Sequence, residues 1–506
     1  MKTTYKIGTR GSLLAVTQAG LVKDELEKLS GKKFELVLIK TQGDEITNKP
    51  LWQLEGKDFF TKELDQALEA QEVDLVIHSY KDLGSIRPSF IKLAAITERK
   101  YAHDVLLIKK ERIKELKNLN SLKVGTSSPR RIVNLTNSLK EYLPVSRETT
   151  ITCDMLRGNV NTRIKKLQDG QYDAITLALA GVERLATGEG SRQELAHLLD
   201  GLTYFVLPQS LFPSAASQGA LAVEINKSNE GSELESIIHK LHHPSTAEEI
   251  KREREAFASY GGGCHLAVGI HVKKVQSYFV HFHRGEVDGK KIEKKYIEGL
   301  TYPQVKAGLK FVGLPKLTNT NDIPDLYLEK KPLAKSLALK NKAAFVTTRY
   351  ALPALEASET PETIWAAGTR TLKELVNKNF WVNGCTDSLG IEDLKHLSQS
   401  KALRLMSPQL IDWVTLTHDS SQNIMGEKIG VYERILRDTD EDFDQKIKTA
   451  TAFYWTSFYQ FETYLKKYPG IKEADHFCGL GKTFQEFHRH GIKVFPVGSM
   501  EDFYSL

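Results

Sequence analysis

The stretch VDLVIHSYKDL, residues 73–83, places a short apolar run directly before a polar turn. Its apolar residues are consecutive and do not alternate with polar ones, which is typical of a strand buried on both faces of a sheet. YDAITLALAGVERL, residues 172–185, repeats the same plan of a strand followed by a turn. We therefore expect two α/β lobes, each built on a largely parallel sheet.

Strand-like and helix-like segments alternate around both stretches. Residues 12–29 carry apolar residues at helical spacing behind Ser12, a favoured N-cap residue. We expect residues 1–101 and 102–202 to form two domains, with a pair of strands at about 203–225 returning to the first. Two lobes joined by crossing strands form a cleft, and ligands of open α/β sheets bind at the carboxyl ends of the strands.

The remainder of the chain predicts two further parts. Three strand-like segments predict a small α+β domain over 226–312, and the proline- and asparagine-containing stretch 313–339 predicts a linker. In the last part, 340–506, residues 366–382 and 479–494 share a glycine-rich turn and a helix that begins near a threonine. This weak repeat predicts two similar α/β halves.

The composition is that of an ordinary globular protein. The chain has 506 residues, of which 41% are hydrophobic and 26% charged, so several domains are expected. Its net charge of +6 does not by itself indicate nucleic-acid binding. The four cysteines are far apart, which argues against a zinc site or a disulfide framework and favours reduced thiols. Because no signal-peptide pattern is evident, we expect a cytoplasmic protein.

Several arginines follow predicted strands or begin predicted helices. Planar guanidinium groups fit carboxylates and phosphates, and helix N-termini also favour anions. A cleft between the lobes would bring these side chains together, so we expect a substrate rich in anionic groups. The candidates are Arg10, Arg130, Arg131, Arg157, Arg163 and Arg184.

The turn HSYKDL offers a hydroxyl, a cation and a carboxylate in Ser79, Lys81 and Asp82. Delivered into a cleft by a strand, Asp82 could protonate a leaving amine and then stabilise the cation that remains. The alternative at this point is an ordinary ion pair in a surface loop. His78 lies on the apolar strand, where a structural role is expected.

Cys264 follows three glycines, Gly261 to Gly263. Glycines leave the thiol uncrowded and allow unusual backbone dihedrals, which suits a presented thiol. A lone cysteine, however, is more often a small core residue. Both interpretations are open from this stretch alone.

Residues 5 to about 310 resemble the porphobilinogen deaminase family, also called hydroxymethylbilane synthases. The matching segments, in the family's order, are IGTRGSLLAVTQ, GKDFFTKELDQAL, VDLVIHSYKDL, VGTSSPRR, LRGNVNTR, DAITLALAGVERL, SQGALAVE and GGGCHLAVG. The resemblance implies two lobes like those of periplasmic binding proteins plus a third small domain. It also implies a monomeric deaminase part that adds four porphobilinogen units to a dipyrromethane cofactor, in the pathway to haem.

The resemblance assigns individual residues as well. It implies that Cys264 holds the cofactor through a thioether and that Asp82 is the catalytic aspartate. Further cofactor contacts would be Ser79, Lys81, Thr126, Ser128, Arg130, Arg131, Arg157 and Gly158. Substrate contacts would be Arg10, Gln18, Arg157, Arg163 and Arg184, with Lys57 and Phe60 on a loop over the cleft. No metal site is implied.

The C-terminal part is weakly similar to the uroporphyrinogen III synthase family, which closes the linear tetrapyrrole into a ring. The similarity rests on VTTR, VYER, YWTS and the closing segment from residue 479. Candidate cleft residues are Tyr432, Thr456, Ser457 and Thr483. The stretch between FVTTRY and TIWAAGTRT is shorter than the family pattern, so we expect part of one lobe to be missing. A degenerate, non-catalytic domain is therefore the alternative.

Two other classes of function compete for the whole chain. A non-enzymatic protein that binds an anionic solute would also use two lobes around an arginine-lined cleft, although the absent signal peptide argues against it. A nucleic-acid binder would use the basic residues, but they lack neighbouring aromatic residues and a recognised motif.

Overall fold

The computed structural model describes residues 2–41, 61–84, 86–263, 265–305, 307–315, 322–419, 421 and 424–506. The chain divides into two compact units. Unit 1 comprises Met1–Lys274, Phe282–Lys294 and Leu397–Pro408, and unit 2 comprises Val275–His281, Lys295–His396 and Gln409–Leu506. No helix within the described ranges is both long and apolar enough to cross a membrane.

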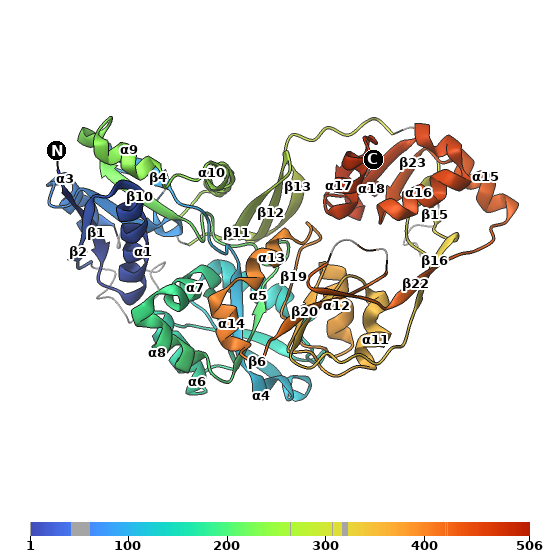
Figure 1. The fold of residues 1–506 in the computed structure, drawn as a ribbon, viewed down its shortest axis with the longest axis horizontal. Coiled ribbons are helices and arrows are strands. Elements are labelled where there is room, and N and C mark those ends of the chain that lie inside the picture. The colour runs from blue at the N-terminus through green and yellow to red at the C-terminus, as the bar shows by residue number, and fades with distance from the viewer. Residues whose placement is uncertain are drawn as a thin grey trace. The chain divides into compact units, whose positions relative to one another are not determined.

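The first lobe of unit 1 is a five-stranded sheet in the order β2-β1-β3-β10-β4 (Figure 1). Its strands are β1 (Thr4–Arg10), β2 (Lys33–Ile39), β3 (Leu75–Ser79), β4 (Ile91–Ile96) and β10 (Leu221–Asn226). Its helices are α1 (Leu13–Ser30), α3 (Lys62–Glu69) and α9 (Glu233–His239), and α10 (Pro244–Ser259) follows. β1 is parallel to β2 and β3, whereas β10 is antiparallel to β3 and β4. As expected, the Ser12 side chain caps α1 by accepting a hydrogen bond from the Ala15 N–H.

The second lobe repeats this pattern in the order β7-β6-β8-β5-β9. Its strands are β5 (Asp104–Lys109), β6 (Ser121–Gly125), β7 (Thr150–Asp154), β8 (Ala174–Ala178) and β9 (Leu202–Val206). Its helices are α4 (Lys110–Ile113), α5 (Pro129–Ser138), α6 (Val160–Gln168), α7 (Leu179–Thr187) and α8 (Glu189–Leu199). β5 is antiparallel to both neighbours, so in each lobe the fourth strand in this order opposes the others.

The predicted return of both strands within 203–225 is wrong for one of them. β10 crosses to the first sheet, but β9 pairs along its length with β5 and stays in the second. Both strands are almost fully buried, so their composition did not distinguish the two sheets.

Beyond α10, the chain forms the three strands expected for the small third domain. β11 (Ala267–Val275), β12 (Tyr278–Val287) and β13 (Lys290–Ile297) make a three-stranded sheet in sequence order.

Unit 2 contains two five-stranded parallel sheets, in the orders β15-β14-β23-β24-β25 and β19-β18-β17-β20-β21. The first uses β14 (Lys310–Val312), β15 (Ile323–Pro324), β23 (Ala452–Trp455), β24 (Asp475–Gly479) and β25 (Phe495–Val497). The second uses β17 (Lys342–Val346), β18 (Thr363–Ala366), β19 (Gly384–Cys385), β20 (Asp412–Thr417) and β21 (Glu427–Gly430). An antiparallel pair, β16 (Leu328–Pro332) and β22 (Tyr432–Leu436), lies outside both sheets.

Helices flank both of these sheets along the chain. They are α11 (Leu352–Glu356), α12 (Thr369–Asn377), α13 (Glu392–Ser398), α15 (Glu441–Thr449), α16 (Phe458–Lys467), α17 (Lys482–Arg489) and α18 (Met500–Tyr504). One more, α14 (Lys401–Met406), belongs to unit 1. The two repeated segments of the sequence lie in different sheets, each as a strand followed by a helix.

The expectation that part of one lobe is missing is wrong. The strands that seemed absent lie before residue 340, because β14 pairs in parallel with β23 and β15 pairs with β14. The stretch 313–339, expected to be a linker, contains β15 and β16. Strands of two to five residues are too short for a sequence period to be recognised, which explains the error.

Candidate active site

A cavity of about 980 Å³ lies between the two lobes of unit 1. Its polar lining consists of Arg10, Ser12, Gln18, Lys40, Ser79, Lys81, Asp82, Arg131, Arg157, Asn159, Thr162, Arg163, Lys166, Arg184 and Gln218. Eight of these side chains are cationic, and Asp82 is the only acidic one among the described lining residues. The described part of the lining is therefore strongly positive and carries one carboxylate.

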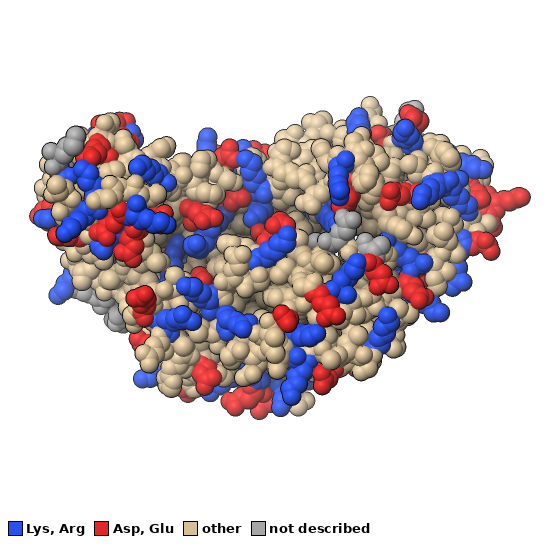
Figure 2. All heavy atoms as spheres, viewed as in Figure 1, with Lys and Arg blue, Asp and Glu red and all other residues tan. Residues whose placement is uncertain are grey.

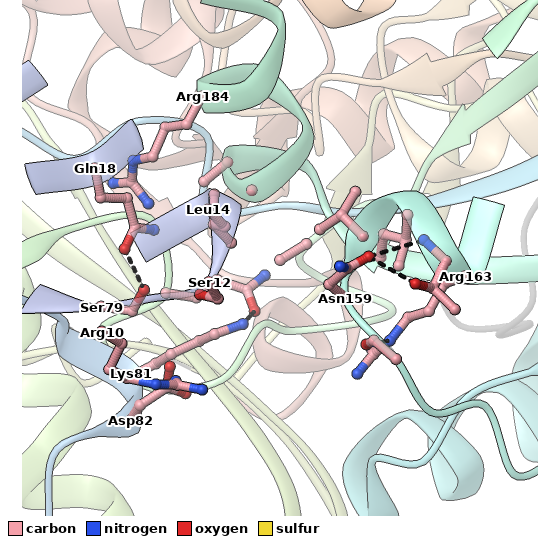
Figure 3. A pocket seen from close by; sticks show the side chains of 18 of the residues that line it. Arg10, Ser12, Leu14, Gln18, Ser79, Lys81, Asp82, Asn159, Arg163 and Arg184 are labelled. Carbon is pink, nitrogen blue, oxygen red and sulfur yellow. Dashed lines mark hydrogen bonds between the residues drawn. The ribbon is translucent and has the colours of Figure 1, made fainter. Parts of the chain in front are cut away.

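Two parallel strands bring the first-lobe residues to one edge of the sheet. β1 ends at Arg10 and β3 ends at Ser79, and the two strands pair directly. Their carboxyl ends consequently meet, as expected for ligand sites in α/β sheets. From α1, the buried Gln18 accepts a hydrogen bond from the Ser79 hydroxyl at 3.0 Å (Figure 3).

Lys81 and Asp82 lie in a single 3₁₀ turn, Tyr80–Asp82, directly after β3. Both side chains line the same cavity as Arg10 (Figure 3). The Lys81 ammonium donates to the Gln218 side-chain oxygen at 3.3 Å. Burial lowers the pKa of Lys81 to about 8, although the nearby Asp82 carboxylate favours the charged form. Asp82 itself is exposed to the cavity.

A buried carboxylate, Asp104, supports the arginines at the start of α5. Arg131 binds it through two hydrogen bonds, from Nε at 3.0 Å and from Nη2 at 2.7 Å. Arg130 forms an ion pair with the same carboxylate at 2.8 Å and donates to the Pro213 carbonyl. Burial alone would raise the pKa of Asp104, but the charges of Arg130 and Arg131 outweigh it and lower this pKa. Asp104 is thus a fixed negative charge behind the lining.

The second lobe contributes cations from α6 and the loop before it. Arg163 donates from Nε to the Gly158 carbonyl at 2.7 Å, and Lys166 donates to the Arg157 carbonyl at 3.1 Å. Burial, together with the charges of Arg131 and Arg157, lowers the pKa of Arg163 to about 10. Gly158 has a φ of +116°, and a Cβ there would lie 2.7 Å from the Thr162 methyl group. A glycine is therefore required at this turn.

Arg184 reaches the cavity from α7. It is buried and donates from Nη2 to the Gly219 carbonyl at 2.7 Å. Burial lowers the pKa of Arg184 to about 10. Like charges gathered in a partly desolvated site repel one another, so a polyanionic ligand would be strongly favoured here.

Most residues predicted from the sequence do come together. The cavity lining includes Arg10, Gln18, Ser79, Lys81, Asp82, Arg131, Arg157, Gly158, Arg163 and Arg184. Thr126, Ser128 and Arg130 are not part of it; Thr126 and Arg130 are buried, and Arg130 is turned toward Asp104. Lys57, Phe60 and Cys264 lie outside the described residues.

Sequence reasoning missed Ser12, Lys40, Asn159, Thr162, Lys166 and Gln218, as well as Asp104 behind them. Asn159 had a usable signal, because asparagine before a helical segment favours an N-cap, and its side chain accepts from the Thr162 N–H at 2.8 Å. No pattern in the neighbouring sequence indicated a role for Gln218. It donates a hydrogen bond to Asp104, more than a hundred positions away in the sequence.

The three glycines before Cys264 adopt the unusual dihedrals expected of them. Gly261, Gly262 and Gly263 have φ values of +102°, +64° and +96°. All three lie in the left-handed region that other residues rarely adopt. The backbone leading to Cys264 thus depends on these glycines.

Within the first lobe, three buried side chains of the types that bind metal ions lie close together. Asp65, His78 and Glu224 place oxygen and nitrogen atoms within 4.8 Å of one another. The Arg87 guanidinium already donates to both carboxylates, at 2.5 Å to Asp65 and 2.8 Å to Glu224. Burial, with the charges of Arg87 and Arg10, lowers the pKa of His78 to about 3. Arg87 and the two carboxylates thus form a buried ion-pair network, and the His78 Nε2 lies 3.5 Å from the Glu224 carboxylate.

Unit 2 has its own cavity, of about 940 Å³. Tyr432, Thr456, Ser457 and Thr483, the candidate cleft residues of the C-terminal part, all line it. Its charged lining consists of Lys330, Arg349, Arg370, Arg434, Arg437 and Lys482 together with Asp325, Glu329, Glu462 and Glu486. Cations outnumber carboxylates in its described lining, though less strongly than in the first cavity, and hydroxyl groups are frequent.

Aromatic rings in the second cavity lie close to several of its cations. The Tyr432 ring lies 5.8 Å from that of Tyr350 and 5.4 Å from that of His418. The Arg434 guanidinium lies 4.2 Å from the Tyr459 ring centroid, within cation–π distance. Burial lowers the pKa of Lys330 to about 8, and the charge of Arg434 lowers it further.

The outer surface differs from the two cavities. On the face shown in Figure 2, Lys and Arg are interspersed with Asp and Glu. A basic patch of the kind that binds nucleic-acid backbones is not seen on this face.

Two solved structures resemble parts of the chain at low TM-scores. A uroporphyrinogen-III synthetase from Helicobacter pylori has a TM-score of 0.28 at 15% identity, covering 38% of this chain and 95% of its own. A substrate-binding protein of an amino-acid transporter from Streptococcus thermophilus has a TM-score of 0.26 at 14% identity, covering 51% and 82%. At these values neither structure supports an assignment.

Sequence relatives are far closer. Residues 5–233 match the family model described as porphobilinogen deaminase, dipyromethane cofactor binding domain. The porphobilinogen deaminase of Gloeobacter violaceus is 36% identical over 278 residues, covering 54% of this chain and 77% of that protein. That of Trichlorobacter lovleyi is 35% identical over 306 residues, covering 60% and 90%. The aligned relatives and the cation-lined cavity around Asp82 lead to one conclusion: the chain belongs to the porphobilinogen deaminase family.

Proposed function

We propose that unit 1 is a porphobilinogen deaminase, or hydroxymethylbilane synthase. It would join four porphobilinogen units head to tail with release of ammonia, in the biosynthesis of haem and related tetrapyrroles. The observation that carries this proposal is the cavity whose described lining contains eight cationic side chains and one carboxylate, that of Asp82.

The cavity lining fits the cofactor of the family. Dipyrromethane carries several carboxylates, which match the guanidinium and ammonium groups of Lys81, Arg131 and Arg157. When bound through a thioether to Cys264, it supplies the primer on which the chain grows. Arg130 would act indirectly, since it shares Asp104 with Arg131 and holds that carboxylate in place.

The remaining cations would bind the substrate. Porphobilinogen carries an acetate and a propionate, so each added unit brings two further negative charges into the cavity. Arg10, Arg163 and Arg184 offer donors for these groups. Without such donors, desolvation and repulsion of the carboxylates would be severe.

Asp82 is the residue we assign to the chemistry. As the bond between the methylene carbon and the amine nitrogen breaks, the Asp82 carboxyl would give the nitrogen a proton, and ammonia leaves. The pyrrole that remains is cationic, and the Asp82 carboxylate would stabilise that charge at the ring nitrogen. The α-carbon of the growing chain then bonds to the methylene carbon, and its proton returns to the Asp82 carboxylate.

Intact-mass analysis of the full chain tests the proposal. The wild type should be heavier than its sequence by one covalent dipyrrole, and Cys264→Ser should remove this increment together with activity. A non-enzymatic solute-binding protein would have its sequence mass. A wild type with that mass and full activity would contradict the role of Cys264.

We further propose that unit 2 closes the linear tetrapyrrole to uroporphyrinogen III with inversion of one ring. The support is its cavity of about 940 Å³, whose cations and hydroxyl groups suit the same polycarboxylate product. A non-catalytic unit 2 is the alternative. Product analysis distinguishes them, because spontaneous closure without inversion yields isomer I.

A further inference from the structure

A short helix from the C-terminal part of the sequence belongs to unit 1. α14 lies in the segment Leu397–Pro408, which is part of unit 1 although the chain on either side belongs to unit 2. It contacts α7, α8 and β9, and Figure 1 shows it beside α7 and α8. Ala402, Leu403 and Met406 are buried. The second lobe is thus covered by a helix outside residues 5–233, which match the family model.

One carboxylate joins α14 to α7. Glu183, on α7, accepts hydrogen bonds from the Ser400 hydroxyl at 2.6 Å and from the backbone N–H groups of Lys401 and Ala402 at 3.1 and 3.0 Å. Ser400 is itself the N-cap of α14 and accepts from the Leu403 N–H at 3.2 Å. The first N–H groups of a helix have no partner within it, and its N-terminus favours negative charge. The Glu183 carboxylate accepts hydrogen bonds from two of these N–H groups and places a negative charge at the N-terminus of α14.

The same helix α7 lines the deaminase cavity. Ala180, Gly181 and Arg184 are lining residues, and Arg184 follows Glu183 directly in the sequence. Successive helical residues point about 100° apart. One side of α7 therefore holds the anion-binding arginine while the adjacent side receives α14.

We infer that the segment Leu397–Pro408 braces α7 and that Glu183 is a positioning residue for Arg184. The brace couples a segment of the C-terminal sequence to the substrate-binding arginine of the deaminase cavity. Weakening the Glu183 contacts should consequently weaken substrate binding more than it slows the chemical step. The kinetic part of this inference rests on the proposed function of unit 1, whereas the docking of α14 does not.

Hydrogen exchange on the full chain tests the docking. The amides of Lys401, Ala402 and Leu403 should be protected in the wild type. In Glu183→Ala they should exchange at least about tenfold faster, because a charge-assisted acceptor is lost. Wild-type amides that exchange at the rate of an unstructured peptide would overturn the brace.

Kinetics on the full chain test the positioning role. We expect Glu183→Ala to raise the KM for porphobilinogen about threefold or more while kcat changes less than about twofold. Glu183→Gln should restore part of the wild-type KM, because its single amide oxygen can still accept from the Ser400 hydroxyl and the Ala402 N–H, while the Lys401 N–H loses its acceptor. Ser400→Ala should act in the same direction, and it remains informative if Glu183→Ala does not fold.

Ser232→Ala is the matched control. Ser232 caps α9 and accepts from the Glu235 N–H at 3.2 Å, the same bond length as at Ser400. This variant should lose stability without a change in KM. A change in KM no larger in Glu183→Ala and Ser400→Ala than in Ser232→Ala would overturn the positioning role. A wild type that consumes no porphobilinogen would instead refute the proposed function, and the exchange measurement would still decide the brace.

Discussion

At the scale of single residues, the described lining of the cavity in unit 1 contains one carboxylate, that of Asp82, and eight cationic side chains. Asp82 follows β3 in the same turn as Lys81, and Arg10 lines the same cavity. A carboxylate placed in such a cavity can stabilise a positive charge that develops on a bound substrate. Burial lowers the pKa of Lys81, so its ammonium group loses its charge more easily.

Asp82→Asn tests the assigned role directly. The amide keeps the shape but carries no charge, so kcat should fall by about a hundredfold or more. The fold should be retained. Ammonia release from porphobilinogen measures the rate. Glu98→Gln, an exposed carboxylate outside the lining, should leave it unchanged. A near-normal rate in Asp82→Asn would refute this role.

Lys81 predicts a pH dependence at the alkaline side. Its pKa of about 8 means that the ammonium is charged below this pH and neutral above it. Carboxylate binding should weaken as pH rises, with kcat/KM falling by up to about tenfold per pH unit above 8. In the unfolded chain, Lys81 keeps its proton to a higher pH than in the folded protein. Its titration therefore makes the free energy of unfolding rise, and not fall, as the pH increases above about 8.

Two arginine variants check this interpretation in a pH profile of kcat/KM. Lys81→Arg keeps its charge, so the alkaline decline should move to higher pH. Lys40→Arg, at an exposed lining position, should leave the decline in place. An unchanged decline in Lys81→Arg would assign the titration to another group.

At the scale of elements, the start of α5 depends on one counter-ion. Arg130 and Arg131 are adjacent, yet only Arg131 lines the cavity, and both are held by the buried Asp104. A buried ion pair contributes little net stability while intact, but removing one partner leaves buried charge uncompensated.

Asp104→Asn should therefore lower the free energy of unfolding by about 3–5 kcal/mol, measured in urea. The lowered pKa of Asp104 means that its contribution is present above its unfolded pKa of about 3.9 and is lost as pH falls below it. Asp173→Asn is the control. Asp173 also accepts from an arginine at 2.7 Å, but that pair is partly exposed, so its loss should cost at most about 1 kcal/mol.

At the scale of the whole molecule, the chain carries two cavities of similar size, and in each the cations of the described lining outnumber the carboxylates. Both are lined by cations and hydroxyl groups, and each lies within its own unit. The product of the first proposed reaction keeps every carboxylate of its four substrate units. The second cavity would therefore meet the same kind of polyanion.

Variants of the full chain separate the two activities. We use substitutions because a chain cut near residue 320 would also remove Leu397–Pro408 from unit 1. Arg434→Leu should leave porphobilinogen consumption unchanged and shift the oxidised product from uroporphyrin III mainly to isomer I. Lys446→Gln, outside the second cavity lining, should keep isomer III. Isomer I from the wild type would leave unit 2 without this activity.

Much of the cavity in unit 1 could be predicted because its signals are local. Arg10 and Ser79 end strands that show in the apolar pattern, and Pro129 marks the first turn of α5. Short strands gave no such signal. β14 has three residues and β15 two, and they form a sheet only by pairing with each other and with β23. The linker prediction failed for that reason.

The sequence by itself determined the longer strands and helices of unit 1 and the charged residues at their ends, since these depend on neighbours in the chain. Only the tertiary structure decided which of two adjacent arginines, Arg130 or Arg131, lines the cavity. It also decided that Glu183 caps a helix that begins more than two hundred positions later. Each of these contacts requires a partner that folding brings close, and neither the hydrophobic periodicity nor a short sequence motif identifies that partner.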